Sequence, residues 1–118
     1  MEHKDWLKKA DEDLDTAKFN ITGGKISSGI FFLQQSAEKS LKAMYIKKFK
    51  TLFRTHDLEI LAKRLKAPRQ ILEYCSELNP AYQYTRYPDI PQQKDINLRI
   101  NDFIKYTEEI IKWVKKSI

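Results

Sequence analysis

The apolar residues of this chain recur at steps of three and four positions, and this spacing limits the folds open to it more than any other feature. In residues 3–21 the stripe is formed by Trp6, Ala10, Leu14, Ala17 and Ile21. Such a stripe lies along one face of an α-helix. No stretch shows sustained alternation of apolar and polar residues, so we expect no β-sheet. Only three Gly and four Pro occur in 118 residues, too few for the many turns of an all-β protein.

A second helix is predicted over residues 26–49, with apolar residues on two of its sides. Its main stripe is Ile30, Leu33, Ala37, Leu41 and Met44. Its other stripe is Phe32, Ala43, Ile46 and Phe49. A helix that is apolar on two sides either lies at the centre of the fold or faces a partner subunit. The second stripe exceeds what one small bundle is expected to bury, so we predict that it forms the interface of a homodimer.

Shorter elements are predicted in the second half of the chain. They are a loop over 50–56, a third helix that Thr55 or Asp57 caps and that ends at about Leu65, a helix from Pro68 to 78, a loop over 79–91, and a last helix from Gln92 or Asp95 to Lys116. Asn79 should end the fourth helix, because the residue before a proline disfavours the helical region. The predicted fold is all-α: one domain over residues 1–118, an up-and-down bundle of four to five helices.

The charge pattern leaves two interpretations open. The net charge is +6, but residues 39–69 hold ten Lys or Arg against Asp57 and Glu59, a local balance of +8. This segment either attracts phosphate groups or is a solvated, lysine-rich surface. The acidic residues of the first helix have spacings that scatter them around it, so we predict no metal site there.

Cysteine usage and hydropathy exclude other classes of protein. The lone Cys75 permits neither an intrachain disulfide nor a cysteine-based zinc site, and we expect it to be a buried thiol. We predict no cofactor. The longest apolar run, Ile30 to Leu33, is far too short to span a membrane, and no signal peptide is evident. A cytoplasmic location is therefore expected.

Three groups of polar residues interrupt the apolar rhythm. The first is Gln35, Glu38 and Lys42, which share one face of the second helix. The second is Thr55-His56-Asp57-Leu58, and the third is Tyr84-Thr85-Arg86-Tyr87-Pro88-Asp89. Charged groups are costly to bury unless they are paired. Three such breaks in one small helical chain therefore predict a single assembled polar site.

Each group has a structural and a functional interpretation. Glu38 and Lys42 form either an exposed i,i+4 pair or part of a site. His56 is either a general acid or base or a structural residue, and Asp57 is either a site residue or a helix cap. Arg86 suits a planar, bidentate partner, which is either a phosphate or an internal carboxylate. The candidate carboxylates are Glu38 and Asp89. The tyrosines at 82, 84 and 87 either stack on bases or pack inward.

Taken together and in this order, the three groups resemble the HEPN family of small helical domains, over nearly the whole chain. The resemblance implies a helical bundle that is usually dimeric, association with nucleotides or RNA, and a minimal nucleotidyltransferase as partner. Carried over residue by residue, it points to Glu38, Lys42, His56, Asp57, Arg86, Tyr87 and Asp89. HEPN ribonucleases carry an Arg followed after four to six residues by a His near the last helix. Neither Arg86 nor Arg99 has such a His, so ribonuclease activity is not carried over.

Three functions remain as hypotheses. The favoured one is a regulatory module that binds a nucleotide or RNA, with phosphate on Lys42 and Arg86 and a base on Tyr84 or Tyr87. The second is an atypical, metal-independent ribonuclease of toxin–antitoxin type, with His56 as general base and Arg86 stabilising the developing charge. The third is a polar network that only fixes the fold and the dimer. No P-loop, GxGxxG or HExxH motif supports another enzyme class.

Overall fold

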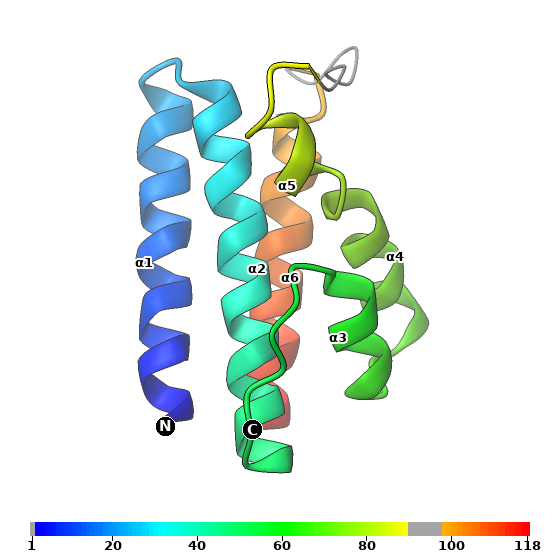
Figure 1. Ribbon diagram of the computed structural model, residues 1–118. Helices are drawn as coiled ribbons and strands as arrows, with labels where there is room; N and C mark the ends of the chain where they lie inside the picture. Colours follow the sequence, from blue (N-terminus) through cyan, green and yellow to red (C-terminus); the bar gives the residue numbers. More distant parts are fainter. Residues whose placement is uncertain (1, 90–97) are drawn as a thin grey trace.

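The computed structural model describes residues 2–89 and 98–118, and it is a bundle built around one central helix (Figure 1). The helices in the described part are α1 (His3–Thr22), α2 (Ile26–Phe49), α3 (Leu58–Arg64), α4 (Arg69–Leu78), the single turn α5 (Ala81–Tyr84) and α6 (Ile100–Ser117). The described residues contain no β-strand. The all-α prediction is confirmed. Within the described residues, no helix combines the length and apolar content that crossing a bilayer requires.

Helix α2 is central because it buries side chains on all of its sides. It packs against α1, α3, α5 and α6. Its buried residues include Ala43 and Ile46, which were predicted to lie in a dimer interface. Neighbouring helices of the same chain cover them, so they offer almost no exposed area to a partner. Of the other two predicted interface residues, Phe32 is half-buried against the core and Phe49 is 42% exposed.

Helices α1 and α2 form an antiparallel pair that is joined by the turn at Gly23 and Gly24 (Figure 1). Gly24 has φ +84°, a left-handed conformation that favours glycine. Close packing is achieved at Gly29, where an added Cβ would lie 3.1 Å from the Ala17 carbonyl oxygen. Helices α1 and α2 therefore approach each other closely at this glycine.

Buried polar contacts also fasten α1 to α2. Asp13 is almost completely buried and is paired with Lys39 of α2. The Ser36 hydroxyl donates a hydrogen bond of 2.7 Å to the Ala10 carbonyl oxygen. The spacing of the acidic residues in α1 argued against a metal site, but it gave no sign that Asp13 joins two helices.

Helix α6 runs parallel to α2 and antiparallel to α1, so both chain termini lie at the same end of the bundle (Figure 1). Two ion pairs define the antiparallel arrangement, Lys18 with Glu108 and Asp11 with Lys115. Helix α6 begins later than predicted, because Leu98 and Arg99 form a turn. The predicted starts at Gln92 and Asp95 lie outside the described residues.

Helices α3 and α4 form a hairpin on the other side of α2 (Figure 1). Pro68 is the N-cap of α4 rather than its first helical residue. Cys75 is fully buried here, as predicted. Burial raises the pKa of its thiol to about 12, and the nearby carboxylates of Glu59 and Asp57 contribute to the rise. This thiol is therefore a core group that stays protonated at neutral pH.

One prediction about the stretch after α4 is wrong. Residues 79–91 were expected to be a loop, but Ala81–Tyr84 form the turn α5. Asn79 keeps helical angles (φ −54°, ψ −45°) although Pro80 follows it. The side chain of Asn79 explains this, because it accepts a hydrogen bond from the Leu58 amide and donates one to Asp57, both of 2.8 Å. These tertiary bonds outweigh the local preference of a residue before proline.

Candidate functional site

The centre of the polar site is Glu38, a carboxylate on the buried surface of α2. Its side chain is 4% exposed. Lys42, one helical turn further along α2, donates to Oε2 over 2.9 Å. His56, at the end of the loop before α3, places Nδ1 3.0 Å from Oε1. Both oxygens of the buried carboxylate are therefore bound, which offsets the cost of removing the charge from water.

Gln34 completes this centre and was missed in the sequence. It is fully buried, and its Nε2 donates to the His56 carbonyl oxygen over 3.2 Å and lies 3.4 Å from Glu38 Oε1. Its own Oε1 accepts a hydrogen bond of 2.7 Å from Gln35. Gln34 lies four residues before Glu38, just as Lys42 lies four after it. The i,i+4 spacing that selected Lys42 would also have selected Gln34.

The exposed part of the site is a ladder of three side chains, His56, Tyr82 and Arg86. The His56 and Tyr82 rings stack with centroids 4.1 Å apart and an angle of 16° between planes. Arg86 donates from Nη1 to the Tyr82 hydroxyl oxygen over 3.0 Å, and its Cζ lies 4.8 Å from the ring centroid. Among the described residues, no carboxylate forms an ion pair with Arg86. The predicted internal partners of Arg86, Glu38 and Asp89, are therefore not its ion-pair partners here.

Tyr82 is the tyrosine that holds the ladder together, whereas the favoured sequence hypothesis relied on Tyr84 and Tyr87. Tyr82 and Arg86 are four residues apart, the spacing that makes side chains neighbours on a helix. This spacing was not used in the sequence analysis, because the stretch was predicted to be a loop. Tyr87 is 46% exposed, with its ring centroid 5.9 Å from the Arg86 Cζ. The side chain of Tyr84 lies outside the described residues.

Lys42 is placed differently from what a phosphate ligand requires. Its side chain is 8% exposed, and its ammonium is bound by Glu38 and lies 6.0 Å from the centroid of the Trp6 ring. The structure therefore places Lys42 in the buried centre and Arg86 on the exposed ladder. Asp89, which was predicted to join the cluster, is exposed.

Asp57 is a helix cap that connects two elements of the site. Its Oδ1 accepts hydrogen bonds from the amides of Glu59 and Ile60 and from the Asn79 side chain. Burial alone would raise the pKa of the Asp57 carboxyl, but these bonds and the nearby Lys63 outweigh it and lower the pKa below 3.8. Asp57 is therefore ionised at neutral pH, and its cap holds His56 in position at the start of α3.

A shallow pocket of about 460 Å³ opens beside the ladder. Its lining residues are His56, Asp57, Asn79, Pro80, Tyr82 and Gln83. The pocket combines the Tyr82 ring and the His56 imidazole with the side-chain amides of Asn79 and Gln83 and the Asp57 carboxylate. Arg86, which donates to the Tyr82 hydroxyl, places a cation next to it. Within the described residues, no three His, Cys, Asp or Glu side chains gather closely enough to hold a metal ion.

The comparisons with known proteins agree with this architecture. A family model described as the HEPN domain matches residues 3–117. The chain belongs to the HEPN domain family. The predicted family is thus confirmed for almost the whole chain. No match was found among curated protein sequences.

Solved structures carry the same HEPN fold. The archaeal HEPN homologue ST0689 is 27% identical, with a TM-score of 0.81 and 99% of this chain and 98% of that chain covered. The protein TT1696 from Thermus thermophilus is 23% identical, with a TM-score of 0.87 and 98% of each chain covered. The HEPN domain protein tm0613 from Thermotoga maritima is 20% identical, with a TM-score of 0.76 and 94% of each chain covered. At these identities the two bacterial structures establish similarity of fold.

Proposed function

We propose that this HEPN domain is a regulatory module that binds a nucleotide, either free or as part of an RNA, at the ladder of His56, Tyr82 and Arg86. The observation that carries the proposal is the exposed Arg86 guanidinium, which Tyr82 orients and which no described carboxylate neutralises. A guanidinium presented in this way binds phosphate oxygens in a bidentate manner. The adjoining pocket offers aromatic and amide groups to a base.

The buried centre has a separate role in this proposal. Glu38 and Lys42 neutralise one another away from solvent, so they fix the position of His56 and do not contact the nucleotide. This division assigns the purely structural interpretation to the buried half of the site. Binding is assigned to the exposed half.

The test is isothermal titration calorimetry with ATP, carried out on the wild type and on Arg86→Ala. A charged hydrogen-bond pair contributes about 1.5–3 kcal/mol, so we expect Arg86→Ala to weaken binding by about 10- to 100-fold. The matched control is Arg69→Ala, which removes an equally charged but 92% exposed side chain of α4. Thermal melts followed by circular dichroism should remain nearly unchanged for both variants. Equal affinity in both variants, or a large loss of stability in Arg86→Ala, would contradict the proposal.

The proposed partners rest on the resemblance to other HEPN proteins. HEPN proteins of the kind that this chain resembles act beside a minimal nucleotidyltransferase and form homodimers, and we propose both for this chain. Light scattering of the purified protein at micromolar concentration tests the homodimer. Co-purification with a nucleotidyltransferase encoded next to it tests the partner.

A second candidate is the atypical ribonuclease, and the Glu38–His56 contact favours it. Because Nδ1 of His56 faces the buried carboxylate, Nε2 is the nitrogen left to exchange a proton with a substrate. The His56 side chain is 53% exposed, and Arg86 contacts Tyr82, the residue on which the His56 ring stacks. Incubation of RNA with the protein in EDTA, beside His56→Ala, decides the matter. Intact RNA, or cleavage that survives in His56→Ala, would exclude this mechanism.

A further inference from the structure

The end of the bundle that holds both termini is strongly basic. Helices α2 and α6 end there and α1 begins there (Figure 1). The end of α3 joins them, because Arg64 lies 3.5 Å from the Tyr45 hydroxyl of α2. The last turn of α2 carries Lys47 and Lys48, that of α3 carries Lys63 and Arg64, and that of α6 carries Lys115 and Lys116. We call this surface the basic end and include in it Lys50, the C-cap of α2.

Compensation of helix dipoles explains only a small part of this charge. A helix C-terminus carries roughly half a negative charge, so three of them bring about −1.5. Their last turns carry six basic side chains, of which Lys115 is paired with Asp11. Among the described residues, the other five and Lys50 form no ion pair with a carboxylate. The basic end therefore keeps a large positive surplus that faces solvent.

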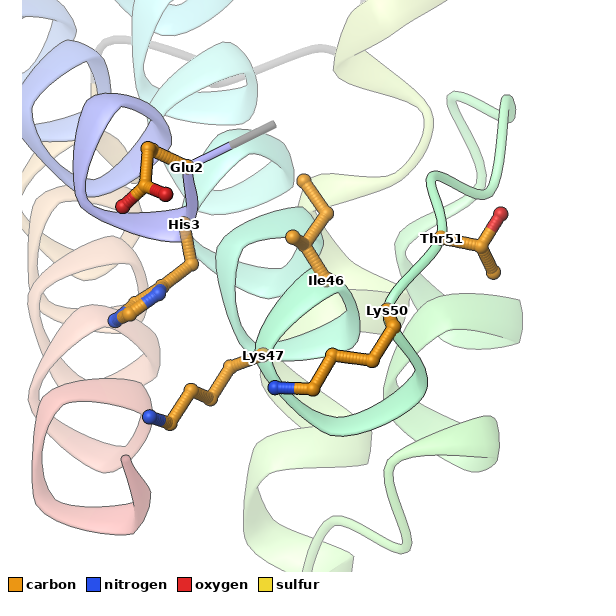
Figure 2. A pocket seen from close by; sticks show the side chains of 6 residues that line it. All are labelled: Glu2, His3, Ile46, Lys47, Lys50 and Thr51. Atoms are coloured by element: carbon orange, nitrogen blue, oxygen red, sulfur yellow. The ribbon is translucent and has the colours of Figure 1, made fainter.

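Part of this surplus surrounds a pocket of about 360 Å³ between the start of α1 and the end of α2. Figure 2 shows the side chains of Lys47 and Lys50 extending to the same side as the His3 ring. Thr51 adds a hydroxyl, and Glu2 is the acidic residue among those that line the pocket. Two ammonium groups, an imidazole and a hydroxyl around one pocket are suited to a phosphate.

An aromatic ring lies exposed among these cations. Phe49 is 42% exposed, and its ring centroid lies 4.6 Å from that of Tyr45 and 5.4 Å from the Lys48 ammonium. Tyr45 also contacts Phe53, and the Arg64 guanidinium lies 4.0 Å from the Phe53 ring centroid. Tyr45 is buried, so it supports Phe49 from within. Phe49 is thus a supported aromatic surface with cations on its borders.

We infer that the basic end binds single-stranded nucleic acid, with Lys47 and Lys50 on phosphates and Phe49 stacked on a base. Basic side chains along the backbone and aromatic rings under the bases are the two components of single-strand binding. This inference goes beyond the proposed function, because it concerns a second surface formed by other residues than His56, Tyr82 and Arg86. A polynucleotide, and not a single nucleotide, is the ligand that the basic end takes.

The test is fluorescence anisotropy of a labelled 15-mer of oligouridine at several salt concentrations. The variant Lys47→Gln/Lys50→Gln removes two phosphate ligands, and the control Lys25→Gln/Lys105→Gln removes the same charge from exposed lysines outside the basic end. Each phosphate contact contributes about 0.7 to the slope of log K against log salt for single strands. The first variant should therefore lower the slope by about 1.4, whereas the control should change it much less. Phe49→Leu should weaken binding by about tenfold without changing the slope.

Further binding measurements distinguish this inference from the proposed function and from binding to a lipid surface. Lys47→Gln/Lys50→Gln should leave ATP binding unchanged, and Arg86→Ala should weaken oligouridine binding less than Lys47→Gln/Lys50→Gln does. Equal effects of the two lysine variants on oligouridine binding would overturn the inference. So would loss of oligouridine binding in Arg86→Ala alone. Sedimentation with phosphatidylserine vesicles, without any oligouridine binding, would assign the basic end to a membrane surface and would also overturn it. Thermal melts monitored by circular dichroism test whether each variant is folded.

Discussion

At the residue scale, Glu38 and Arg86 are two charged side chains with opposite environments. Glu38 is almost completely buried and has both oxygens occupied, by Lys42 and by His56. Arg86 is exposed and rests on the Tyr82 ring. A buried ion pair rarely adds much stability over an apolar pair, but breaking it leaves an uncompensated charge. Glu38 therefore matters for the stability of the fold, whereas Arg86 is available to a ligand.

A prediction at this scale concerns Glu38→Gln. The substitution removes the carboxylate charge and leaves the Lys42 ammonium buried without its partner, so we expect the free energy of unfolding to fall by about 3–5 kcal/mol. Urea unfolding followed by circular dichroism measures it. The double variant Glu38→Gln/Lys42→Met should recover part of the loss, because no buried charge is left. A loss below about 1 kcal/mol in the single variant would show that Lys42 reaches solvent without Glu38.

At the element scale, the start of α3 depends on Asp57 and Asn79. Asp57 accepts from two amides of the first turn, and Asn79 connects this turn to the end of α4. Because Asn79 is held in this way, it stays helical before Pro80 and allows α5 to begin immediately afterwards. The position of Tyr82, and with it the ladder, is thus a consequence of a cap 25 residues earlier in the chain.

A prediction at this scale concerns the pH dependence of that cap. The pKa of Asp57 is lower in the folded chain than its ordinary value of 3.8, so the ionised carboxylate stabilises the fold above that value. The contribution is lost as the pH falls through the lowered pKa. At pH 7 we expect Asp57→Ala to be less stable than the wild type by about 1 kcal/mol. In urea titrations between pH 7 and about pH 2 this difference should shrink on the acid side. A difference that stays constant over the whole range would contradict the assignment of the charged cap.

At the scale of the whole molecule, the burial of α2 changes what a homodimer can use. The two stripes of α2 were predicted to serve the core and the interface respectively. The structure uses Ala43 and Ile46 for packing within one chain. A homodimer remains a proposal, and its contact has to be built from side chains that are still exposed.

The corresponding prediction concerns Ile46→Ala. The Ile46 side chain is 5% exposed, so its truncation should lower the free energy of unfolding by about 2–5 kcal/mol, independently of protein concentration. Phe49→Ala, at a half-exposed position three residues later, should cost clearly less. Urea unfolding at two protein concentrations, together with the mass from light scattering, tests both. A variant Ile46→Ala that keeps its stability but halves a dimeric mass would place Ile46 in an interface after all.

The sequence by itself determined the helices, the family and most members of the polar site. Helical periodicity is a local property, so the bounds of α2 were predicted correctly, and those of α1 and α3 to within about one residue. Likewise, His56, Glu38 and Arg86 were selected because each polar group breaks the apolar rhythm. Local propensity predicted a loop at 81–84, but the structure has a helical turn there. This turn follows Asn79, whose side chain is hydrogen-bonded to Leu58 and Asp57, 21 and 22 positions earlier in the chain.

Only the tertiary structure decided which polar residues are buried together and which face solvent. Lys42 and Arg86 are equivalent as cations in the sequence, and packing separates them. The neighbours of α2 exclude water from Lys42, so its charge requires Glu38, whereas Arg86 on the exposed ladder keeps its hydrogen-bonding capacity for a ligand. The same packing turned Ile46 from a predicted interface residue into a core residue. Burial depends on elements that are distant in sequence, and that is why periodicity alone predicted the members of the site but not their roles.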